Sequence, residues 1–205
     1  MKQIDYCLFE APLGTFGIAW SERENSSAPP AVAFLQLPEA TTGRTESRIQ
    51  QQSGAGNASV PPPRIAEVIE RVRKHLEGEV QDFQDVLLDL DGSPPFARRV
   101  YQAARKIPVG QTMTYGELAR AAGRPAAARA VGQALRKNPI ALIIPCHRVL
   151  AAGGSLGGFS AHGGRATKTR MLAIEGVTFE RLSATAPAAR PKPSIFCAAP
   201  SSRRP

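Results

Sequence analysis

The fold is decided by the stretch Thr114–Asn138, which reads TYGELARAAGRPAAARAVGQALRKN. It opens with a capping box, in which a threonine N-cap is followed three residues later by a glutamate. The turn Gly123-Arg124-Pro125 ends this first helix, and a second is expected from about Ala126 to Lys137. Two short helices joined by a tight glycine-containing turn are typical of a helix-turn-helix. Because helical hairpins are common, this pattern alone is compatible with DNA binding but does not indicate it.

The segments around this stretch divide into strands before it and helices beside it. Residues 1–37 have the apolar alternation and short apolar runs of β-strands. The apolar positions between Ile65 and Leu76 fall on one helical face, so a helix ending at Gly78 is expected, and 86–90 would form a further strand. Another helix is expected after Pro94-Pro95, and one more over Thr167–Ile174.

These elements predict an α+β fold with two domains and a tail. A small strand-rich N-terminal α+β domain is expected at 1–92, and a helical C-terminal domain containing the helix-turn-helix at 93–180. Residues from about 38 to 63 are rich in Thr, Ser, Gln, Gly and Pro, which predicts a mobile loop. The Ala-, Pro-, Ser- and Arg-rich residues 181–205 predict a disordered basic tail.

Charge and cysteine content restrict the function classes. The formal net charge of +9 at pH 7 favours a polyanionic partner, with DNA or RNA as the first candidate. The sequence has no run of about 18 apolar residues, so no membrane span is expected, and the N-terminus lacks the apolar core of a signal peptide. The three cysteines form no CxxC pair, which favours a reducing compartment over a disulfide framework.

The segment Ile143–Leu150 reads IIPCHRVL and contains the strongest candidate nucleophile. His147 and Arg148 next to Cys146 are expected to favour the thiolate, which is the nucleophilic form of cysteine. The pair alone is weak evidence, because free cysteines are among the most buried residues and are usually part of the core.

With these motifs in one frame, the sequence resembles the O6-alkylguanine-DNA alkyltransferases, also called methylated-DNA–protein-cysteine methyltransferases. The matching stretch extends from about Phe96 to Gly176. Its motifs follow the family's order: TYGELA at 114–119, ARAVG at 128–132, Asn138-Pro139, PCHRV at 145–149, GGFS at 157–160 and Glu175-Gly176.

The resemblance implies direct repair of DNA. An alkyl group would pass from O6 of a flipped-out guanine to Cys146, irreversibly and once per protein molecule, with activity on O4-alkylthymine left open. By the same resemblance, His147 is the general base acting through a water, and Glu175 orients its imidazole. Asn138 would brace the cysteine loop and the second helix. Tyr115 would push on the 3′ phosphate and donate its hydroxyl to the leaving guanine.

The resemblance also assigns residues to the DNA and to the base. The second helix would enter the minor groove without sequence specificity, with Arg129 inserted into the base stack. The residues expected to contact DNA are Arg129, Tyr115, Ala127, Ala128, Gly132 and Arg136. Those expected to form the base pocket are Val149, Leu135, Phe159 and Ser160. Away from this resemblance, Arg129 would be taken as an ordinary solvent-facing arginine.

No cofactor or metal is expected. Some members of the family hold a structural zinc in the N-terminal domain, but Cys7 and His75 are too few ligands for such a site. We expect a monomer that binds double-stranded DNA and no membrane, located in the cytoplasm, or at the nucleoid if bacterial and in the nucleus if eukaryotic. Two alternatives are a non-catalytic sensor of alkylated bases and a plain helix-turn-helix regulator. The presence of Cys146 counts against both.

Overall fold

The computed structural model describes residues 2–23 and 28–177, and its first part is a three-stranded sheet. The strands β1 (Lys2–Ala11), β2 (Gly14–Arg23) and β3 (Ala31–Gln36) are antiparallel, in the order β1-β2-β3. Gly14 begins β2 with a φ of 119°, a conformation that glycine adopts without steric cost. The strands expected within residues 1–37 are confirmed.

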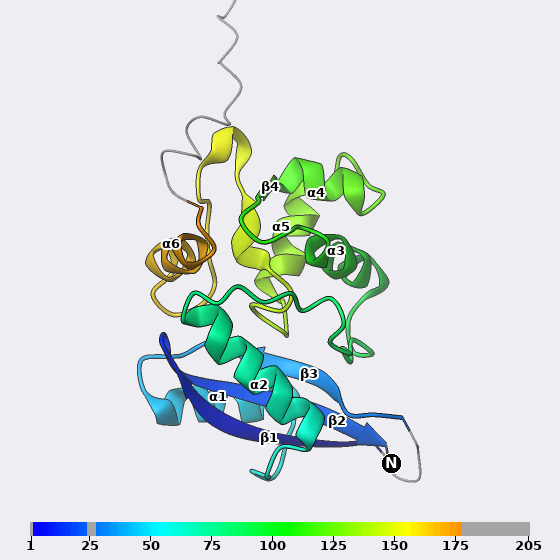
Figure 1. Cartoon of the computed structure of the whole chain (residues 1–205). Helices are drawn as coiled ribbons and strands as arrows, with labels where there is room; N and C mark the ends of the chain where they lie inside the picture. The colour runs from blue at the N-terminus through cyan, green and yellow to red at the C-terminus, as the bar shows by residue number, and fades with distance from the viewer. Residues whose placement is uncertain (1, 24–27, 178–205) are drawn as a thin grey trace, which may run out of the picture.

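Two helices, α1 (Thr42–Ser53) and α2 (Pro63–Leu76), cover opposite faces of this sheet (Figure 1). Alternate residues of a strand point to opposite faces. Accordingly, Ala19 packs with Ile49 of α1, whereas Trp20 belongs to the large core cluster that contains Ile65 of α2. The α2 helix and its stop near Gly78 agree with the apolar periodicity of the sequence.

The prediction of a mobile loop at residues 38–63 is wrong, because α1 occupies the centre of this segment. The Thr41 side chain caps the helix by accepting a hydrogen bond from the Arg44 N–H, and Gly54 ends it with a φ of 69°. Ile49 is the single large apolar residue that α1 buries. It packs on Gly17 of β2, where a Cβ atom would come within 3.2 Å of the Ile49 side chain. So narrow an apolar contact gives almost no periodic signal.

The strand expected at 86–90 is also absent. Leu88 forms only an isolated parallel bridge with Val32 of β3, so the segment runs beside the sheet without extending it. One hydrogen bond on either side of this bridge, from Val32 N–H to Leu87 O and from Asp89 N–H to Val32 O, is all that joins it to β3.

The second part of the chain is helical and contains the predicted helix-turn-helix. Its elements are α3 (Pro95–Arg105), β4 (Met113–Thr114), α4 (Tyr115–Ala121), α5 (Ala128–Arg136), a 3₁₀ turn (Cys146–Arg148), β5 (Val149–Leu150), a second 3₁₀ turn (Ala152–Gly154) and α6 (Arg165–Ile174). Both hydrogen bonds of the capping box are present at Thr114 and Glu117. The short strands β4 and β5 pair in parallel and bring the start of α4 beside the cysteine turn.

The two parts share a continuous core and a backbone seam. Residues of the sheet, of α2, of α3, of α5 and of the segment before the cysteine turn belong to one buried cluster. The seam is formed by β3, where the Leu35 N–H donates to Pro139 O (2.9 Å) and the Ala141 N–H donates to Leu35 O (3.1 Å). The sheet therefore holds the segment that leads into the cysteine turn. No helix in the described part of the chain combines the length and apolar character needed to cross a bilayer.

Replacing Gly54 by alanine tests the α1 helix. A Cβ at this position would meet nothing within 4 Å, so the cost comes from the left-handed backbone alone. We expect the free energy of unfolding to fall by about 1–2 kcal/mol, as measured by urea denaturation. Gly56→Ala is the matched control, because Gly56 is equally open but has no positive φ. Equal stabilities of the two variants would contradict the helix end at Gly54.

Candidate active site

The cysteine turn is held from the end of α5 by Asn138. Its side-chain amide donates from Nδ2 to Ile144 O (2.8 Å), and its Oδ1 accepts from the Ile140 N–H (3.1 Å). The amide therefore spans the loop that leads into Cys146, whose own N–H donates to Ile144 O (2.8 Å). Within this loop Leu142 has a φ of 74°, a conformation that is costly for leucine.

Cys146 is half-buried at the wall of a cavity of about 490 Å³. This volume falls within the usual range of small-molecule sites, about 300–1,000 Å³. The cavity is lined by Arg48, Tyr115, Gly132, Leu135, Arg136, Cys146, Gly158, Phe159 and Ser160. Residues from α4, from α5 and from the segment after β5 thus meet around one thiol, as the sequence motifs predicted.

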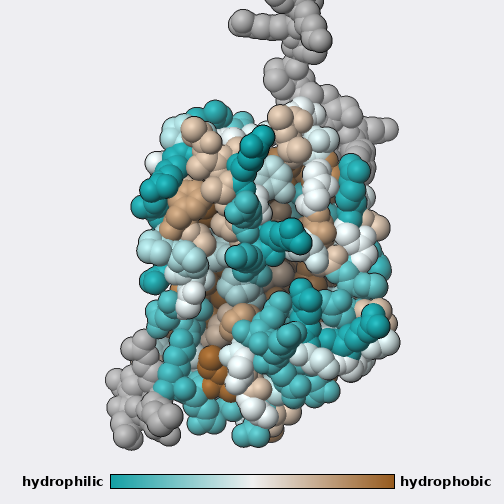
Figure 2. Space-filling model, turned by 180° about the vertical axis from the view of Figure 1, so that it is seen from behind, coloured by the Kyte–Doolittle hydropathy of each residue, from teal (hydrophilic) through white to brown (hydrophobic). Residues whose placement is uncertain are grey.

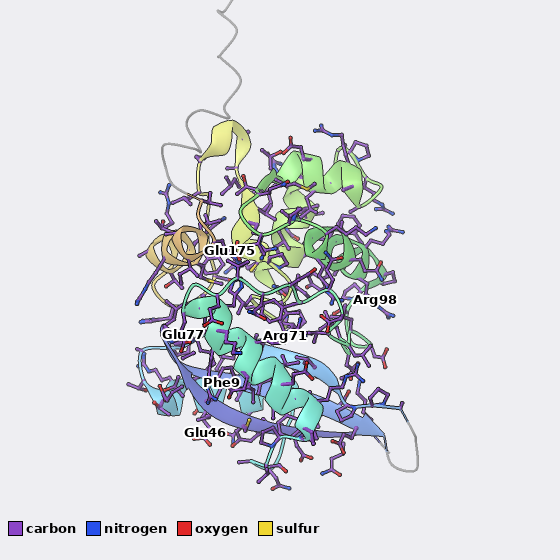
Figure 3. The ribbon with its side chains drawn as sticks, viewed as in Figure 1. Phe9, Glu46, Arg71, Glu77, Arg98 and Glu175 are labelled. Atoms are coloured by element: carbon purple, nitrogen blue, oxygen red, sulfur yellow. The ribbon has the colours of Figure 1, made fainter. Side chains whose placement is uncertain are left out.

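Behind the cysteine lies a buried ionic cluster centred on Glu175, the C-cap residue of α6. The His147 Nε2 lies 2.9 Å from Glu175 Oε1, and Arg148 donates to both carboxylate oxygens, at 2.8 and 2.9 Å. The Glu175 and His147 side chains are fully buried. Figure 3 shows Glu175 in the interior, between α6 and the C-terminal end of α2.

The cluster keeps Glu175 ionised and His147 neutral. Burial alone would raise the pKa of Glu175, but hydrogen bonds from His147, His75 and Arg148 outweigh it and hold the pKa well below its usual range. Burial lowers the pKa of His147, although Glu175 opposes this shift. An ionised carboxylate only accepts hydrogen bonds, so the His147 proton is on Nε2. The buried Nδ1 makes no hydrogen bond to the described residues and is free to accept a proton.

The thiol is held in its protonated form, contrary to the expectation that its neighbours favour the thiolate. Burial raises the pKa of Cys146, and the Asn138 hydrogen bond and the Lys168 charge offset this only in part. Arg148 does not help, because its guanidinium is directed to Glu175 and to Ile107 O. Deprotonation of Cys146 therefore requires a base.

The predicted DNA-contacting residues at the start of α5 lie outside the cavity. Arg129 is exposed, and Ala127 and Ala128 are partly exposed at the first turn of the helix. Figure 2 shows that the face opposite to the view of Figure 1 is mostly hydrophilic, with apolar side chains in smaller patches between polar ones.

Val149 was placed in the base pocket from the sequence, and this prediction is wrong, because Val149 does not line the cavity. Its side chain is fully buried in the core, because β5 pairs Val149 with Met113 of β4 and turns it inward. Its carbonyl oxygen accepts a hydrogen bond from the Lys168 ammonium.

Lys168 and Arg48 were missed by sequence reasoning, and Arg148 and His75 were considered only for other roles, as a neighbour of the thiol and as a possible zinc ligand. Lys168 is fully buried, donates to Val149 O and Leu156 O, and has its pKa lowered to about 8 by burial. Its position three and four residues before Met171 and Leu172 places it on the buried face of α6, which was a usable signal. Arg48 of α1 lines the cavity, and His75 of α2 and Arg148 bind Glu175. These contacts have no local signature.

No cluster of three or more His, Cys, Asp or Glu side chains within residues 2–23 and 28–177 could hold a metal ion. Cys7 is half-buried, and burial raises its pKa to about 11, which makes it a poor nucleophile. Cys197 lies outside the described residues.

Comparison with known proteins agrees with the motifs. Residues 95–177 match the family described as 6-O-methylguanine DNA methyltransferase, DNA binding domain. A methylated-DNA–protein-cysteine methyltransferase of Mycolicibacterium paratuberculosis is 37% identical over 177 residues, which cover 84% of this chain and 92% of the relative. A second methylated-DNA–protein-cysteine methyltransferase, from Methanothermobacter thermautotrophicus, is 42% identical over a region that covers 60% of this chain and 68% of the relative.

Solved structures extend the likeness to the whole fold. The Mycobacterium tuberculosis OGT in complex with DNA superposes with a TM-score of 0.63 and 33% identity, covering 84% of this chain and 93% of its own. The O6-methylguanine-DNA methyltransferase of Pyrococcus kodakaraensis gives the same TM-score at 28% identity, over 85% of this chain and all of its own. With a catalytic-type thiol in a cavity, the family's motifs in order and a relative that matches along most of its length, the chain belongs to the O6-methylguanine-DNA methyltransferase family.

Proposed function

We propose that this protein repairs O6-alkylguanine in DNA by transferring the alkyl group to its own Cys146. The observation that carries the proposal is the thiol at the wall of the cavity, beside a neutral His147 whose proton-accepting nitrogen is free. The DNA-bound relative supports DNA as the partner. A non-catalytic damage sensor is not favoured, because it would leave Cys146 and the buried His147–Glu175 pair without a role.

The transfer is a displacement at carbon. His147 takes the thiol proton through a water, and the sulfur lone pair forms a bond to the alkyl carbon as the carbon–O6 bond breaks. The bond electrons pass to guanine, which takes a proton from the Tyr115 hydroxyl, and the proton held by His147 returns through solvent to the tyrosine. Burial raises the pKa of Tyr115, so its hydroxyl keeps the proton until negative charge develops on the departing guanine. Water does not hydrolyse the resulting thioether, so each molecule acts once.

The base reaches the cavity only by leaving the duplex. We assign this step to α5, whose exposed Arg129 would fill the gap in the stack while Ala127, Ala128 and Gly132 allow close approach to the minor groove. That groove carries little sequence information, which suits repair at any sequence. All of these contacts come from a single copy of the chain, so we propose that the protein binds DNA as a monomer. We infer that the protein acts on chromosomal DNA, in the cytoplasm of a bacterium or in the nucleus of a eukaryote.

Mass spectrometry after incubation with excess duplex containing O6-methylguanine tests the proposal directly. We expect one methyl group on the Cys146 peptide, none on the Cys7 peptide, and no further gain with time. Cys146→Ser should gain nothing while still binding DNA. Damage-selective binding by the unchanged protein without any mass change would instead identify a sensor.

Arg129→Ala should slow repair of duplex DNA about 10- to 100-fold, because flipping costs a few kcal/mol that the inserted side chain would offset. Reaction with the free base O6-benzylguanine, which needs no flipping, should keep its rate. Arg64→Ala on α2 removes the same charge from another exposed helix position and is the control. Equal losses on the two substrates would remove Arg129 from the flipping step.

Glu175→Gln should reduce the free energy of unfolding at pH 7 by about 3–5 kcal/mol, because it leaves Arg148 buried without its partner. The folded-state pKa of Glu175 is depressed, so its contribution is present above the unfolded value of about 4.3 and is lost as pH falls below it. The gap between the two proteins should narrow by about 1.4 kcal/mol per pH unit below about 4 in urea unfolding. Glu77→Gln, at an exposed site, should show no such gap.

A further inference from the structure

A second histidine reaches the carboxylate behind Cys146, from the other part of the molecule. His75 lies near the C-terminal end of α2, and its Nε2 is 3.1 Å from Glu175 Oε1, across 100 positions of sequence. The His75 side chain is 1% exposed and that of Glu175 is 0% exposed. Figure 3 shows Glu175 beside this end of α2. The mechanism proposed above uses no group from α2.

The proton positions in this contact follow from its partners. The Gln81 backbone N–H donates to His75 Nδ1 (3.2 Å), so Nδ1 is an acceptor and the His75 proton lies on Nε2. That proton is donated to Glu175 Oε1, which also accepts from His147 and from Arg148. One carboxylate oxygen therefore has three donors, of which His75 is the one supplied by α2.

We propose that His75 is a positioning residue for alkyl transfer: its Nε2–H fixes Oε1 of Glu175, and through that oxygen the orientation of the His147 imidazole. This inference rests on the proposed function. His147 has only one hydrogen bond to the described residues through its ring, the one to this oxygen. The orientation of the His147 imidazole relative to the Cys146 thiol therefore depends on the position of Glu175 Oε1. Arg148 binds the carboxylate from the same turn as His147, whereas His75 binds it from α2.

The contact also affects the protonation of His147. The charged and titratable groups around this imidazole are Glu175 at the end of α6, Arg148 on its own turn, His75 on α2, and the Cys146–Lys168 pair on the thiol side. Burial does most to lower the pKa of His147, and repulsion from the charge of Arg148 adds to it, whereas the hydrogen bond to Glu175 opposes it. Removal of His75 takes one of the three donors from Oε1 of Glu175, which leaves this oxygen freer to accept from His147. A stronger hydrogen bond to Glu175 raises the pKa of His147.

His75→Phe and His75→Gln separate positioning from packing. Phenylalanine keeps the ring beside Phe83, whose centroid lies 5.5 Å from that of His75, but removes the donor. Glutamine keeps an N–H donor. We expect His75→Phe to react with O6-benzylguanine about tenfold more slowly, and the acid limb of its pH–rate profile to move to higher pH. His75→Gln should stay within about threefold of the unchanged protein.

Val72→Ala is the control for damage to α2, because Val72 is fully buried on the same helix and its side chain has no hydrogen-bond donor to offer Glu175. It should lower the melting temperature and leave the rate and the pH profile unchanged. An unchanged rate and acid limb in folded His75→Phe would overturn the inference, as would equal slowing in His75→Gln. Failure of the unchanged protein to alkylate Cys146 would instead defeat the proposed function, so the two failures are told apart in one assay.

Discussion

The buried carboxylate of Glu175 is the constraint on which the rest of the site depends. Moving a carboxylate out of water costs several kcal/mol, which is recovered only where donors satisfy it in good geometry. Here the donors come from His147 and Arg148 in the cysteine turn and from His75 on α2. The helix that carries Glu175 provides none of them, and the negative end of its dipole disfavours a carboxylate there. The charge is stable only when α6, the cysteine turn and α2 are assembled together.

This arrangement separates storage of the thiol from its use. Burial raises the pKa of Cys146, and the nearby arginine is engaged by Glu175, so the resting protein does not present a free thiolate. The general base His147 can accept the thiol proton, because its imidazole is neutral and its Nδ1 makes no hydrogen bond to the described residues. The thiol then becomes reactive when an alkylated guanine fills the cavity. For a protein consumed in one reaction, a thiol that resists unrelated electrophiles avoids needless loss.

Local features were predictable from the sequence and long-range contacts were not. The helix-turn-helix followed from a capping box, a Gly-Arg-Pro turn and apolar spacing, all of which act within a few residues. The cavity residues Tyr115, Leu135, Phe159 and Ser160 followed from the family motifs. In contrast, α1 buries a single large apolar residue against a glycine of β2, and His75 meets Glu175 across 100 positions. Such pairs leave no periodic pattern, and Val149 was misplaced because a two-residue strand turns it inward.

The motifs that define the family match lie within residues 95–177, yet the site extends beyond them. Arg48 on α1 lines the cavity, His75 on α2 binds the carboxylate, and β3 pairs with the segment that leads into the cysteine turn. The sheet and its two helices are therefore part of the reactive apparatus as well as of the core. Substitutions in this less recognisable half can alter the cavity wall or the hold on Glu175 while every motif stays intact. Differences in activity between relatives with identical motifs would then have a structural origin in α1 and α2.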